Sequence, residues 1–419
     1  MSTTTLDPAA LLADAKRHRL VLEATLTPVS GDRFQPAGFP EIGHVIYKAP
    51  RAVMEMQPPE DGEKDAKPKL VHAKDANGNP RWTTQEVCIV DSAASMANHL
   101  ESVMHDSPQA LTVHPDLNGL PFVRCYTDEG WKPVTKEGAH RLVVTTLSEG
   151  HRLASSYFMG IKTKKKTFQV FVAKEGVKTN EDFGATLRTK IGMADLGTRS
   201  HPLPGDWWKV FTAIFYYDPN SLIHGILFPA LGIKIPRVLT AHHEAFSARR
   251  VETSGVKFDK LQKTNSGQPI FSRDDETPEI IQASFVLDLA LLRSFGSGTN
   301  GLSEPQKQFL LRLIFWKIGR LLENTYRYRS GCDLTCSKVT VRFGEDTFEV
   351  RPNELSSLLT TPLDPLLFRP EGDATPVQTD VYWAADELFK EPEKKTKAGD
   401  GSTDDAPTAE GDNDDDTEE

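Results

Sequence analysis

Apolar residues recur along this chain with two different periods, and this alternation limits the possible folds. Short runs at Arg19–Leu26, Glu86–Val90 and Arg141–Thr145 are typical of buried strands. Asp91 is a good N-cap for a helix over Ser92–Met104. The residues of that helix expected to face the core are Ala93, Ala97, Leu100 and Met104. The pattern predicts an α+β fold with helices packed on a sheet.

The C-terminal half of the chain shows the same alternation of strand-like and helix-like segments. Further strands are expected at Thr167–Ala173, Lys209–Tyr217 and Leu222–Phe228, the last two joined by a turn at Asp218–Ser221. Ser303-Glu-Pro-Gln is a capping box that opens a long, mostly apolar helix reaching to about Tyr328. Strands then a helix, repeated, suit a sheet with helices on one face and a free face for RNA.

Composition divides the chain into a body and two flanking segments. We expect a flexible N-terminus over residues 1–18, one folded body over 19–390, and a disordered acidic tail over 391–419 that has no aromatic residue. Within the body, residues 48–81 are rich in Pro, Lys, Asp and Gly. This excursion predicts a projecting hairpin.

Several protein classes are disfavoured by composition. Hydrophobic residues make up 38% of the chain, which is enough for a sizeable core, and no apolar run approaches the roughly 18–20 residues needed to cross a bilayer. The N-terminus lacks the basic flank and apolar stretch of a secretion signal. Four cysteines are too few for a disulfide scaffold. We therefore expect a cytoplasmic protein that does not bind membranes.

The net charge of −10 does not argue against nucleic acid, because it is concentrated in the tail. From Glu391 to Glu419 there are twelve Asp and Glu against three Lys, which leaves the body at −1. A nearly neutral body can carry a basic groove, since the local field steers a phosphate chain.

Metal and cofactor motifs are weak. Cys332 and Cys336 have no second ligand pair at zinc spacing, so structural thiols are the better interpretation. His242, His243 and Glu244 cannot all face one ligand on a strand or a helix. The glycine loop Gly296–Gly301 lacks the ending of a P-loop. We expect no metal, no cofactor and, without a nucleophile or metalloprotease motif, no enzymatic activity.

Basic and planar residues are more suggestive. Phosphate binding needs rows of cations and gains from planar groups on which bases stack. Lysines crowd residues 162–166 just before a predicted strand, and arginines and lysines follow the predicted hairpin from Arg237 onward. The predicted helix Ser92–Met104 also carries a small, polar stripe: Ser92, Ser95, Asn98 and His99. This stripe could accept an RNA backbone or a second helix.

A series of segments carries a family resemblance: Leu22–Val29, Gly31–Pro40, Val90–Glu101, Glu149–Ser156, Asp218–Gly225, Arg237–Ala241, Ser254–Lys257 and Ser330–Leu334. Their order resembles the Cascade backbone subunit of type I-G (formerly I-U) CRISPR systems, the Cas-seven group of the RAMP superfamily. The resemblance covers roughly Leu20 to Leu334.

The resemblance implies a palm related to the RNA-recognition (ferredoxin-like) fold with an inserted thumb hairpin and helical elaborations. Such subunits polymerise head to tail along a CRISPR RNA, hold its backbone, present its bases to target DNA in antiviral defence, and join other Cascade subunits. A subunit that must accept any guide is expected to contact the phosphates of the RNA rather than the edges of its bases. Residues 48–81 are the favoured thumb, and the lysine-rich turn near Lys164 is the alternative.

The side chains expected to contact RNA are Arg33, Phe34, Ser95, Asn98, His99, His151, Arg152, Lys162, Lys164, Lys165, Lys166, His224, Arg237, His242, Arg249, Arg250 and Lys257. Two alternatives stay open. One is an endoribonuclease of the same superfamily that uses His151 or His242 as general base. The other is a structural scaffold made of protein alone.

Overall fold

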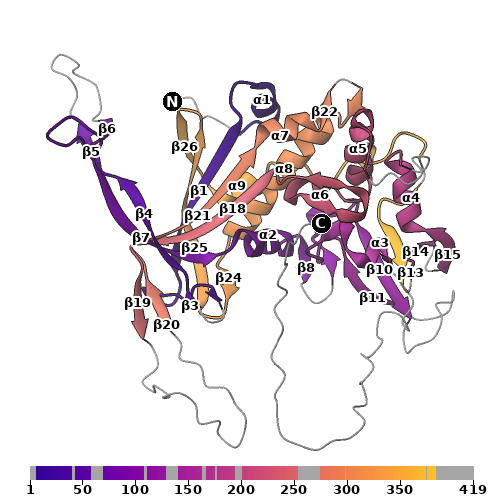
Figure 1. The fold of residues 1–419 in the computed structure, drawn as a ribbon, viewed down its shortest axis with the longest axis horizontal. Helices are drawn as coiled ribbons and strands as arrows, with labels where there is room; N and C mark the ends of the chain where they lie inside the picture. The colour runs from indigo at the N-terminus through magenta and orange to yellow at the C-terminus, as the bar shows by residue number, and fades with distance from the viewer. Residues whose placement is uncertain are drawn as a thin grey trace, which may run out of the picture.

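A computed structural model describes the chain over residues 6–39, 43–57, 69–107, 111–128, 140–162, 167–174, 177–193, 201–252, 274–297, 299–373 and 375–383. Within these ranges, helices and strands combine into an α+β fold (Figure 1). The predicted fold class is confirmed.

The largest element of the described residues is an eight-stranded sheet of order β24-β25-β1-β21-β18-β7-β4, with β26 paired to β25. All of its neighbouring strands run antiparallel. Its strands are β1 (Arg19–Pro28), β4 (Ile46–Ala52), β7 (Trp82–Asp91), β18 (Leu239–Phe246), β21 (Ile280–Asp288), β24 (Tyr326–Arg329), β25 (Cys332–Phe343) and β26 (Asp346–Val350).

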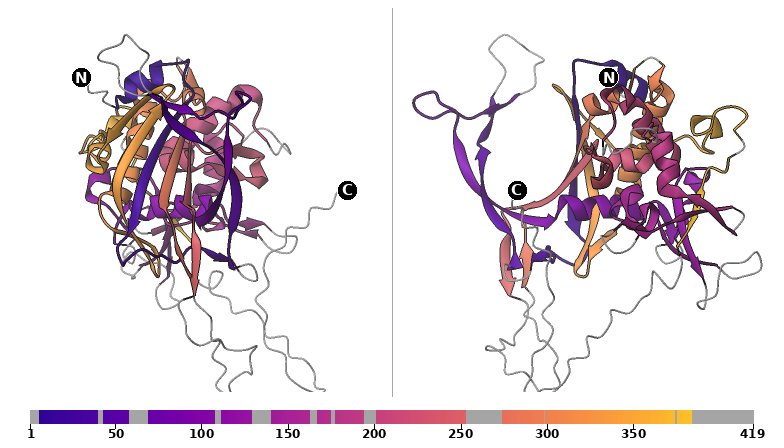
Figure 2. Two further views of the ribbon diagram at one scale, coloured as in Figure 1. Left: turned by 90° about the vertical axis from the view of Figure 1, so that its left-hand side faces the viewer. Right: turned by 45° about the vertical axis from the view of Figure 1, so that its right-hand side comes forward.

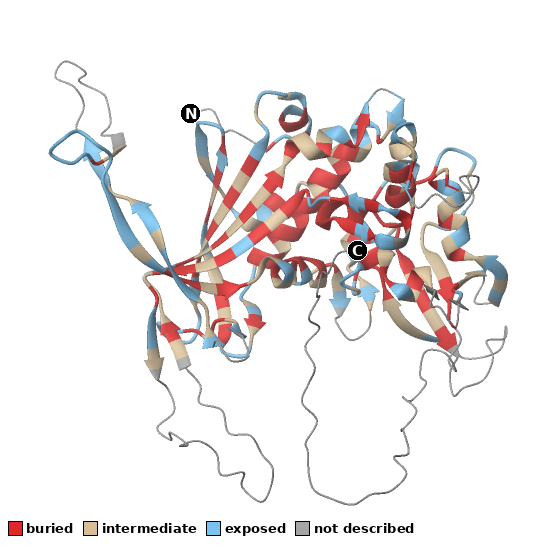
Figure 3. Ribbon diagram, viewed as in Figure 1, coloured by how far each residue is buried: buried red, intermediate tan, exposed pale blue. Residues whose placement is uncertain are grey.

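The two faces of this sheet differ. Along β1 the buried residues are Leu20, Leu22, Ala24 and Leu26, and the residues between them are partly exposed. Because Leu22 pairs with Phe285 of β21, the buried side chains of neighbouring strands share one face. Helices lie on that side, whereas β4 and β7 lead away on the other (Figures 1 and 2). Figure 3 shows the burial concentrated between the sheet and the helices.

The helices that cover the sheet begin at clear capping signals. Ser303 caps α8 in a capping box with Gln306, and Ser92 caps α2 by accepting from the Ser95 amide at 3.1 Å. The helices are α1 (Pro8–Ala13), α2 (Ala93–Ser102), α3 (Ser156–Met159), α4 (Phe183–Lys190), α5 (Trp207–Tyr217), α6 (Pro219–His224), α7 (Leu289–Ser294), α8 (Glu304–Leu322) and α9 (Pro352–Ser356).

A second sheet packs at the other end of the described body, in the order β11-β10-β27-β14-β15. Its strands are β10 (Val123–Asp128), β11 (His140–Thr145), β14 (Phe171–Lys174), β15 (Val177–Asp182) and β27 (Thr379–Tyr382). Residues near the C-terminal end therefore add a strand beside β10, in parallel.

Short ribbons complete the described fold: β2 (Gly38–Phe39) with β3 (Gly43–His44), β5 (Met54–Gln57) with β6 (Lys69–His72), β8 (His105–Ser107) with β9 (Thr112–Val113), β12 (Ile161–Lys162) with β13 (Thr167–Phe168), β16 (Ile226–Phe228) with β17 (Ile233–Ile235), β19 (Arg249–Glu252) with β20 (Asp274–Thr277), and β22 (Gly296–Ser297) with β23 (Asn300–Gly301). Beyond the sheet, β4 and β7 continue into β5 and β6 to form a projecting hairpin, here called the arm (Figure 2).

The largest error of the sequence prediction is at α5. Residues 209–217, expected to be a strand, lie in this helix, whose buried side chains include Val210, Ala213, Ile214 and Tyr217 at helical spacing. An apolar run of this length does not reveal its period, because residues on the less buried side are aromatic too. The expected return strand at Leu222–Phe228 is also wrong over its first half, which belongs to α6.

Element ends differ at four further places. Asp218–Ser221 is a helix start rather than a turn, with Asp218 accepting from the Asn220 amide at 3.1 Å. The long helix ends at Leu322, before β24 begins. The strand expected at Thr167–Ala173 is divided between β13 and β14. In α2 the N-cap is Ser92, while Asp91 accepts from the Ser92 amide.

The N-terminal segment is packed onto the body rather than flexible from residue 6 onward. Leu11 and Leu12 of α1 are buried, and the Arg293 guanidinium donates to the carbonyls of Leu11, Leu12, Asp14 and Arg17. The acidic tail lies outside the described residues. No helix in the described ranges has the length and apolar character that a membrane crossing requires.

Candidate nucleic-acid interface

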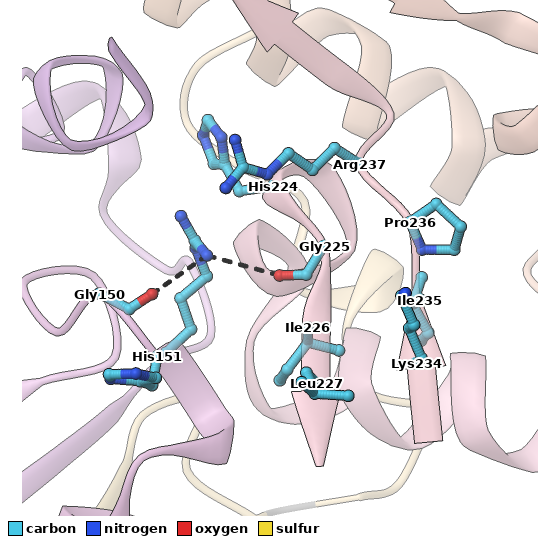
Figure 4. A pocket seen from close by; sticks show the side chains of 11 residues that line it. Gly150, His151, His224, Gly225, Ile226, Leu227, Lys234, Ile235, Pro236 and Arg237 are labelled. Carbon is cyan, nitrogen blue, oxygen red and sulfur yellow. Dashed lines mark hydrogen bonds between the residues drawn. The ribbon is translucent and has the colours of Figure 1, made fainter. Parts of the chain in front are cut away.

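A pocket of about 350 Å³ opens beside the β16–β17 ribbon (Figure 4). The residues that line it come from separate parts of the chain: Gly150, His151, Arg152, His224, Gly225, Ile226, Leu227, Lys234, Ile235, Pro236 and Arg237. Here it is called the ribbon pocket. None of these eleven described lining residues is acidic, which makes the pocket a candidate for an anion.

The ribbon takes its position from the end of α6. Gly225 follows this helix with φ of +78°, a conformation that L side chains rarely adopt. A Cβ at Gly225 would lie 2.8 Å from the Ile235 carbonyl oxygen, so the turn and the second strand are in close contact. Ile226 then pairs with Ile235, which sets Leu227 opposite Lys234.

The rim of the ribbon pocket carries positive charge. Lys234 and Arg237 are both exposed. Arg237 donates to the Ala93 carbonyl at 3.4 Å, so the pocket lies next to the first turn of α2. The His151 side chain is 85% exposed, and its Nδ1 lies 3.1 Å from Glu149 Oε1. Two cations and an imidazole therefore surround the opening.

A buried ionic network forms the floor. Arg152 donates to both carboxylate oxygens of Glu101, at 2.6 and 2.9 Å, and to the carbonyls of Gly150 and Gly225. Asn220 donates to the same Glu101 carboxylate at 2.6 Å and accepts from Lys317 Nζ at 2.5 Å. The network connects α2, α6 and α8 beneath the pocket.

Burial shifts the pKa values of two side chains beneath the pocket. Desolvation raises the pKa of the Asp218 carboxyl to about 7, opposed by the hydrogen bond from Ser221. Desolvation likewise lowers the pKa of Lys317 to about 7, opposed by the attraction of Glu101. The charges of the network are therefore sensitive to local changes near neutral pH.

His224 lies between the floor and the pocket. Its Nε2 is 2.6 Å from Lys317 Nζ, while its Nδ1 has no hydrogen-bond partner among the described residues. Burial, together with Lys317, Arg152 and Arg237, holds the pKa of this imidazole well below its usual range. When Lys317 is protonated it can only donate to Nε2, and in that state the proton of the neutral ring resides on Nδ1.

Four of the side chains predicted from the sequence to contact RNA meet at the ribbon pocket: His151, Arg152, His224 and Arg237. One of them needs correction as a surface contact, and another lies in the pocket wall. Arg152 is directed into the core, where Glu101 neutralises it, and His224 is 1% exposed in the pocket wall. Lys234 was missed because a single lysine between two isoleucines has no local signal.

A second group gathers at β20. Arg33 lies 3.6 Å from Asp275, and Arg250 lies 3.6 Å from the buried carboxylate of Glu276. Phe34 forms a backbone bridge with Glu276 and its ring is buried, so the expected RNA contact by this side chain needs correction. Arg249, which precedes Arg250 in β19, is exposed. Arginine and carboxylate charges largely offset each other in this group.

The polar stripe on α2 is partly used inside the protein. His99 Nε2 lies 2.9 Å from Asp91 Oδ2, and Arg329 contacts the other oxygen of the same carboxylate at 2.9 Å. Desolvation, the largest single effect, would raise the pKa of Asp91, but the hydrogen bond from His99, the charge of Arg329 and the hydrogen bond from Ser95 together lower it. His99 and Ser95 thus anchor the helix start, whereas Asn98 remains exposed.

The remaining predicted residues are spread over the molecule. His242 is exposed on the sheet face opposite the helices, in register with Ser284 of β21. Lys162 ends β12. Lys164, Lys165, Lys166 and Lys257 lie outside the described residues.

A wider hollow of about 690 Å³ lies at the base of the arm. Its basic lining residues are Lys48, Arg51 and Arg249, and its acidic ones are Glu86 and Glu279. The Arg51 guanidinium lies 4.1 Å from the centre of the Phe246 ring. This hollow joins the arm to the β19–β20 ribbon but has mixed charge.

The described ranges contain no group of three or more His, Cys, Asp or Glu side chains able to hold an ion. Burial raises the pKa of the Cys332 thiol to about 12 and also raises the pKa of the Cys336 thiol. His243 is buried and packs against Tyr328, while its neighbour His242 is exposed, so the two imidazoles cannot share a ligand.

Comparison with known families agrees with the resemblance at a coarser level. The family described as CRISPR-associated protein GSU0053 matches residues 20–250, more than half of the 419 residues. No curated protein matches the chain. The matched range contains the complete lining of the ribbon pocket and most of the arm. The chain therefore belongs to the CRISPR-associated protein GSU0053 family, which connects it with CRISPR defence.

Proposed function

We propose that this protein is the RNA-binding backbone subunit of a type I-G Cascade effector complex and is not an enzyme. Copies assemble head to tail along a CRISPR RNA in the cytoplasm, beside other Cascade subunits, and present the guide to target DNA. The observation that carries the proposal is the ribbon pocket, where cationic side chains from separate family motifs meet without an acidic lining residue.

The order of strands supports an RNA-recognition-like palm. In the succession β25-β1-β21-β18, the first and third strands along the chain are central and the second and fourth flank them. Helix α2 lies between β1 and β18 in the sequence, and α8 lies between β21 and β25. This is the order of the split β-α-β ferredoxin-like motif on which RNA-recognition modules are built.

The arm supports the role of a thumb that meets a neighbouring copy. Its exposed apolar side chains are Tyr47, Met54, Met56 and Trp82, with Met56 at 61% and Trp82 at 62% exposure. A solvent-exposed hairpin with several large apolar residues is typical of an interaction surface. An end-to-end contact between two different surfaces forms an open chain of subunits, as a guide of variable length requires.

One observation favours the endoribonuclease alternative. His151 is exposed at the pocket rim and paired with Glu149, the carboxylate–imidazole arrangement that a general base uses. Purified protein should be incubated with repeat RNA in the absence of metal, with His151→Ala as the comparison. The backbone function predicts binding and intact RNA, and a product that disappears in His151→Ala would establish the nuclease instead.

The direct test of binding uses two unrelated guide RNAs. Affinity should be similar for both and should fall steeply with salt, because counterion release from the RNA drives phosphate binding. The double variant Lys234→Ala/Arg237→Ala should weaken binding to both guides. Arg327 is exposed and offers a control in Arg327→Ala, because its guanidinium pairs with Asp333 at the far edge of the large sheet. A strong preference for one guide would contradict the proposal.

A further inference from the structure

The ribbon pocket has the chemistry of a site for one phosphate group. Every polar side chain lining it can donate a hydrogen bond: the Lys234 ammonium, the guanidinium groups of Arg237 and Arg152, and the imidazoles of His151 and His224. Of these, Arg152 is already paired with Glu101. A phosphate offers only acceptor oxygens and negative charge, and guanidinium and ammonium groups are its usual protein ligands.

The buried donor separates this pocket from an ordinary basic surface. His224 is 1% exposed, and a buried donor without a partner is costly unless a ligand or solvent supplies an acceptor. Lys317 occupies Nε2 and leaves the Nδ1–H free. Arg237 and His224 both line the pocket, and Arg237 is among the charges that act on the His224 imidazole, so the two donors belong to one site (Figure 4).

The walls of the pocket are suited to hold these donors in place. The carbonyls of Gly150 and Gly225 lie on opposite sides of the Arg152 guanidinium, which donates to both. The guanidinium is itself held by Glu101. The close approach of Gly225 to Ile235 leaves no room for the ribbon to shift inward. A preformed backbone around the pocket loses little entropy when the anion enters.

We propose that the ribbon pocket holds a single backbone phosphate of the guide RNA between Arg237, Lys234 and the Nδ1–H of His224. The inference rests on the proposed function, because it assigns the phosphate to RNA. His224 acts as a neutral donor, and Lys317 orients it through Nε2. The pocket thereby fixes one nucleotide of each guide segment relative to α2, to whose first turn Arg237 is bonded.

Three substitutions separate the parts of this site. Gly150→Leu adds bulk at a lining position without altering charge, and a Cβ at Gly150 meets no atom within 4 Å. His224→Gln keeps an acceptor for Lys317 but removes the Nδ1–H donor. Arg237→Ala removes the guanidinium. A matched control is Gly205→Leu, since Gly205 also has open space around its Cβ and lies in the short 3-10 helix Pro204–Asp206 before α5, outside the pocket lining.

The first measurement uses inorganic phosphate as the probe and thermal unfolding as the readout, against chloride at equal ionic strength. Phosphate should raise the Tm of the wild-type protein and of Gly205→Leu. The apparent Kd should increase at least about tenfold in Arg237→Ala and His224→Gln, as expected for loss of a charge-assisted contact. It should increase as much in Gly150→Leu, because the added side chain competes with the anion for space. Equal stabilisation of all variants, or none of the wild type, would overturn the phosphate site.

The second measurement identifies the source of the phosphate. Guide RNAs carrying one neutral methylphosphonate at successive positions are bound to wild type and to Gly150→Leu. The affinity of the wild type should fall by about tenfold when the methylphosphonate is at particular positions. The affinity of Gly150→Leu should be the same at every methylphosphonate position. If free phosphate binds but no position matters, the pocket takes a free anion and the inference for RNA is wrong. If RNA does not bind the wild type at all, the proposed function fails while the phosphate result stands on its own.

Discussion

Arg152 and Glu101 form a buried ion pair in which two guanidinium nitrogens reach two carboxylate oxygens, at 2.6 and 2.9 Å. Side-chain exposure is 8% for the arginine and 5% for the glutamate. The pair joins the loop that carries His151 to helix α2, and so links the rim of the ribbon pocket to the helix beside it. Its role is structural, although its neighbour His151 is exposed.

Breaking this pair should destabilise the protein strongly. Arg152→Ala leaves Glu101 charged and buried, for which a loss of about 3–5 kcal/mol in the free energy of unfolding is typical. The adjacent His151→Ala removes an exposed side chain and should change it by less than about 0.5 kcal/mol. Urea unfolding of both variants checks this, and similar stabilities would show that the pair contributes little.

Stability toward acid should depend on His243. This imidazole is fully buried, neither nitrogen has a partner among the described residues, and burial lowers its pKa from 6.5 to about 3. Between those values the unfolded chain binds a proton that the folded protein does not, so stability is lost as pH falls below about 6.5. The loss from this group reaches about 2 kcal/mol at pH 5.

His243→Phe should remove this part of the pH dependence. The ring packs 4.6 Å from the Tyr328 ring, so an aromatic replacement suits the site. Thermal unfolding at pH 7.5 and pH 5 should show a smaller drop in Tm for His243→Phe than for wild type. His242→Phe, at the exposed neighbouring position, should keep the wild-type drop. An unchanged drop in His243→Phe would mean that this histidine does not control acid stability.

The arm should matter for assembly and not for folding. Met56→Glu changes a 61% exposed side chain and should leave the Tm of the isolated protein within about 1 °C, since exposed positions contribute little to stability. Complexes with guide RNA should become shorter or fail to form. Leu366→Glu, at a 64% exposed apolar position near the C-terminal end of the body, is the control. Particles of normal mass with Met56→Glu would exclude this part of the arm from the contact.

The salt dependence of RNA affinity should reveal how many RNA phosphates the ribbon pocket neutralises. For single-stranded nucleic acid the slope of log affinity against log salt is about −0.7 for each phosphate neutralised. Lys234→Ala/Arg237→Ala should reduce the slope by about one such step or more, whereas a loss of affinity with an unchanged slope would point to a structural defect.

Local patterns predicted much of the sheet and its helices. Strands β1 and β7 follow from short apolar runs, and α8 follows from its Ser303 capping box, because these signals lie within a few neighbouring residues. Helix α5 was not predictable in this way. Its Trp, Phe and Tyr residues are typical of strands, and only packing against the rest of the core favours the helix.

The sequence identified several individual residues of the candidate site but not that they lie together in one pocket. Family motifs identify His151, His224 and Arg237, which are far apart in the sequence. Their convergence depends on the turn at Gly225 and on the floor network, both of which are tertiary features. The opposite orientations of Arg152 and His151 also follow from a buried partner, Glu101, that no local pattern identifies.

The central claim is that this chain assembles along RNA, and the mass of its complexes tests that most directly. The protein is expressed with guide RNAs of increasing spacer length, and each complex is measured by native mass spectrometry. An open head-to-tail contact predicts that mass rises with guide length in steps of one subunit, 46.5 kDa each, plus the added RNA. A complex that stays a monomer or a fixed dimer at every guide length would contradict the account.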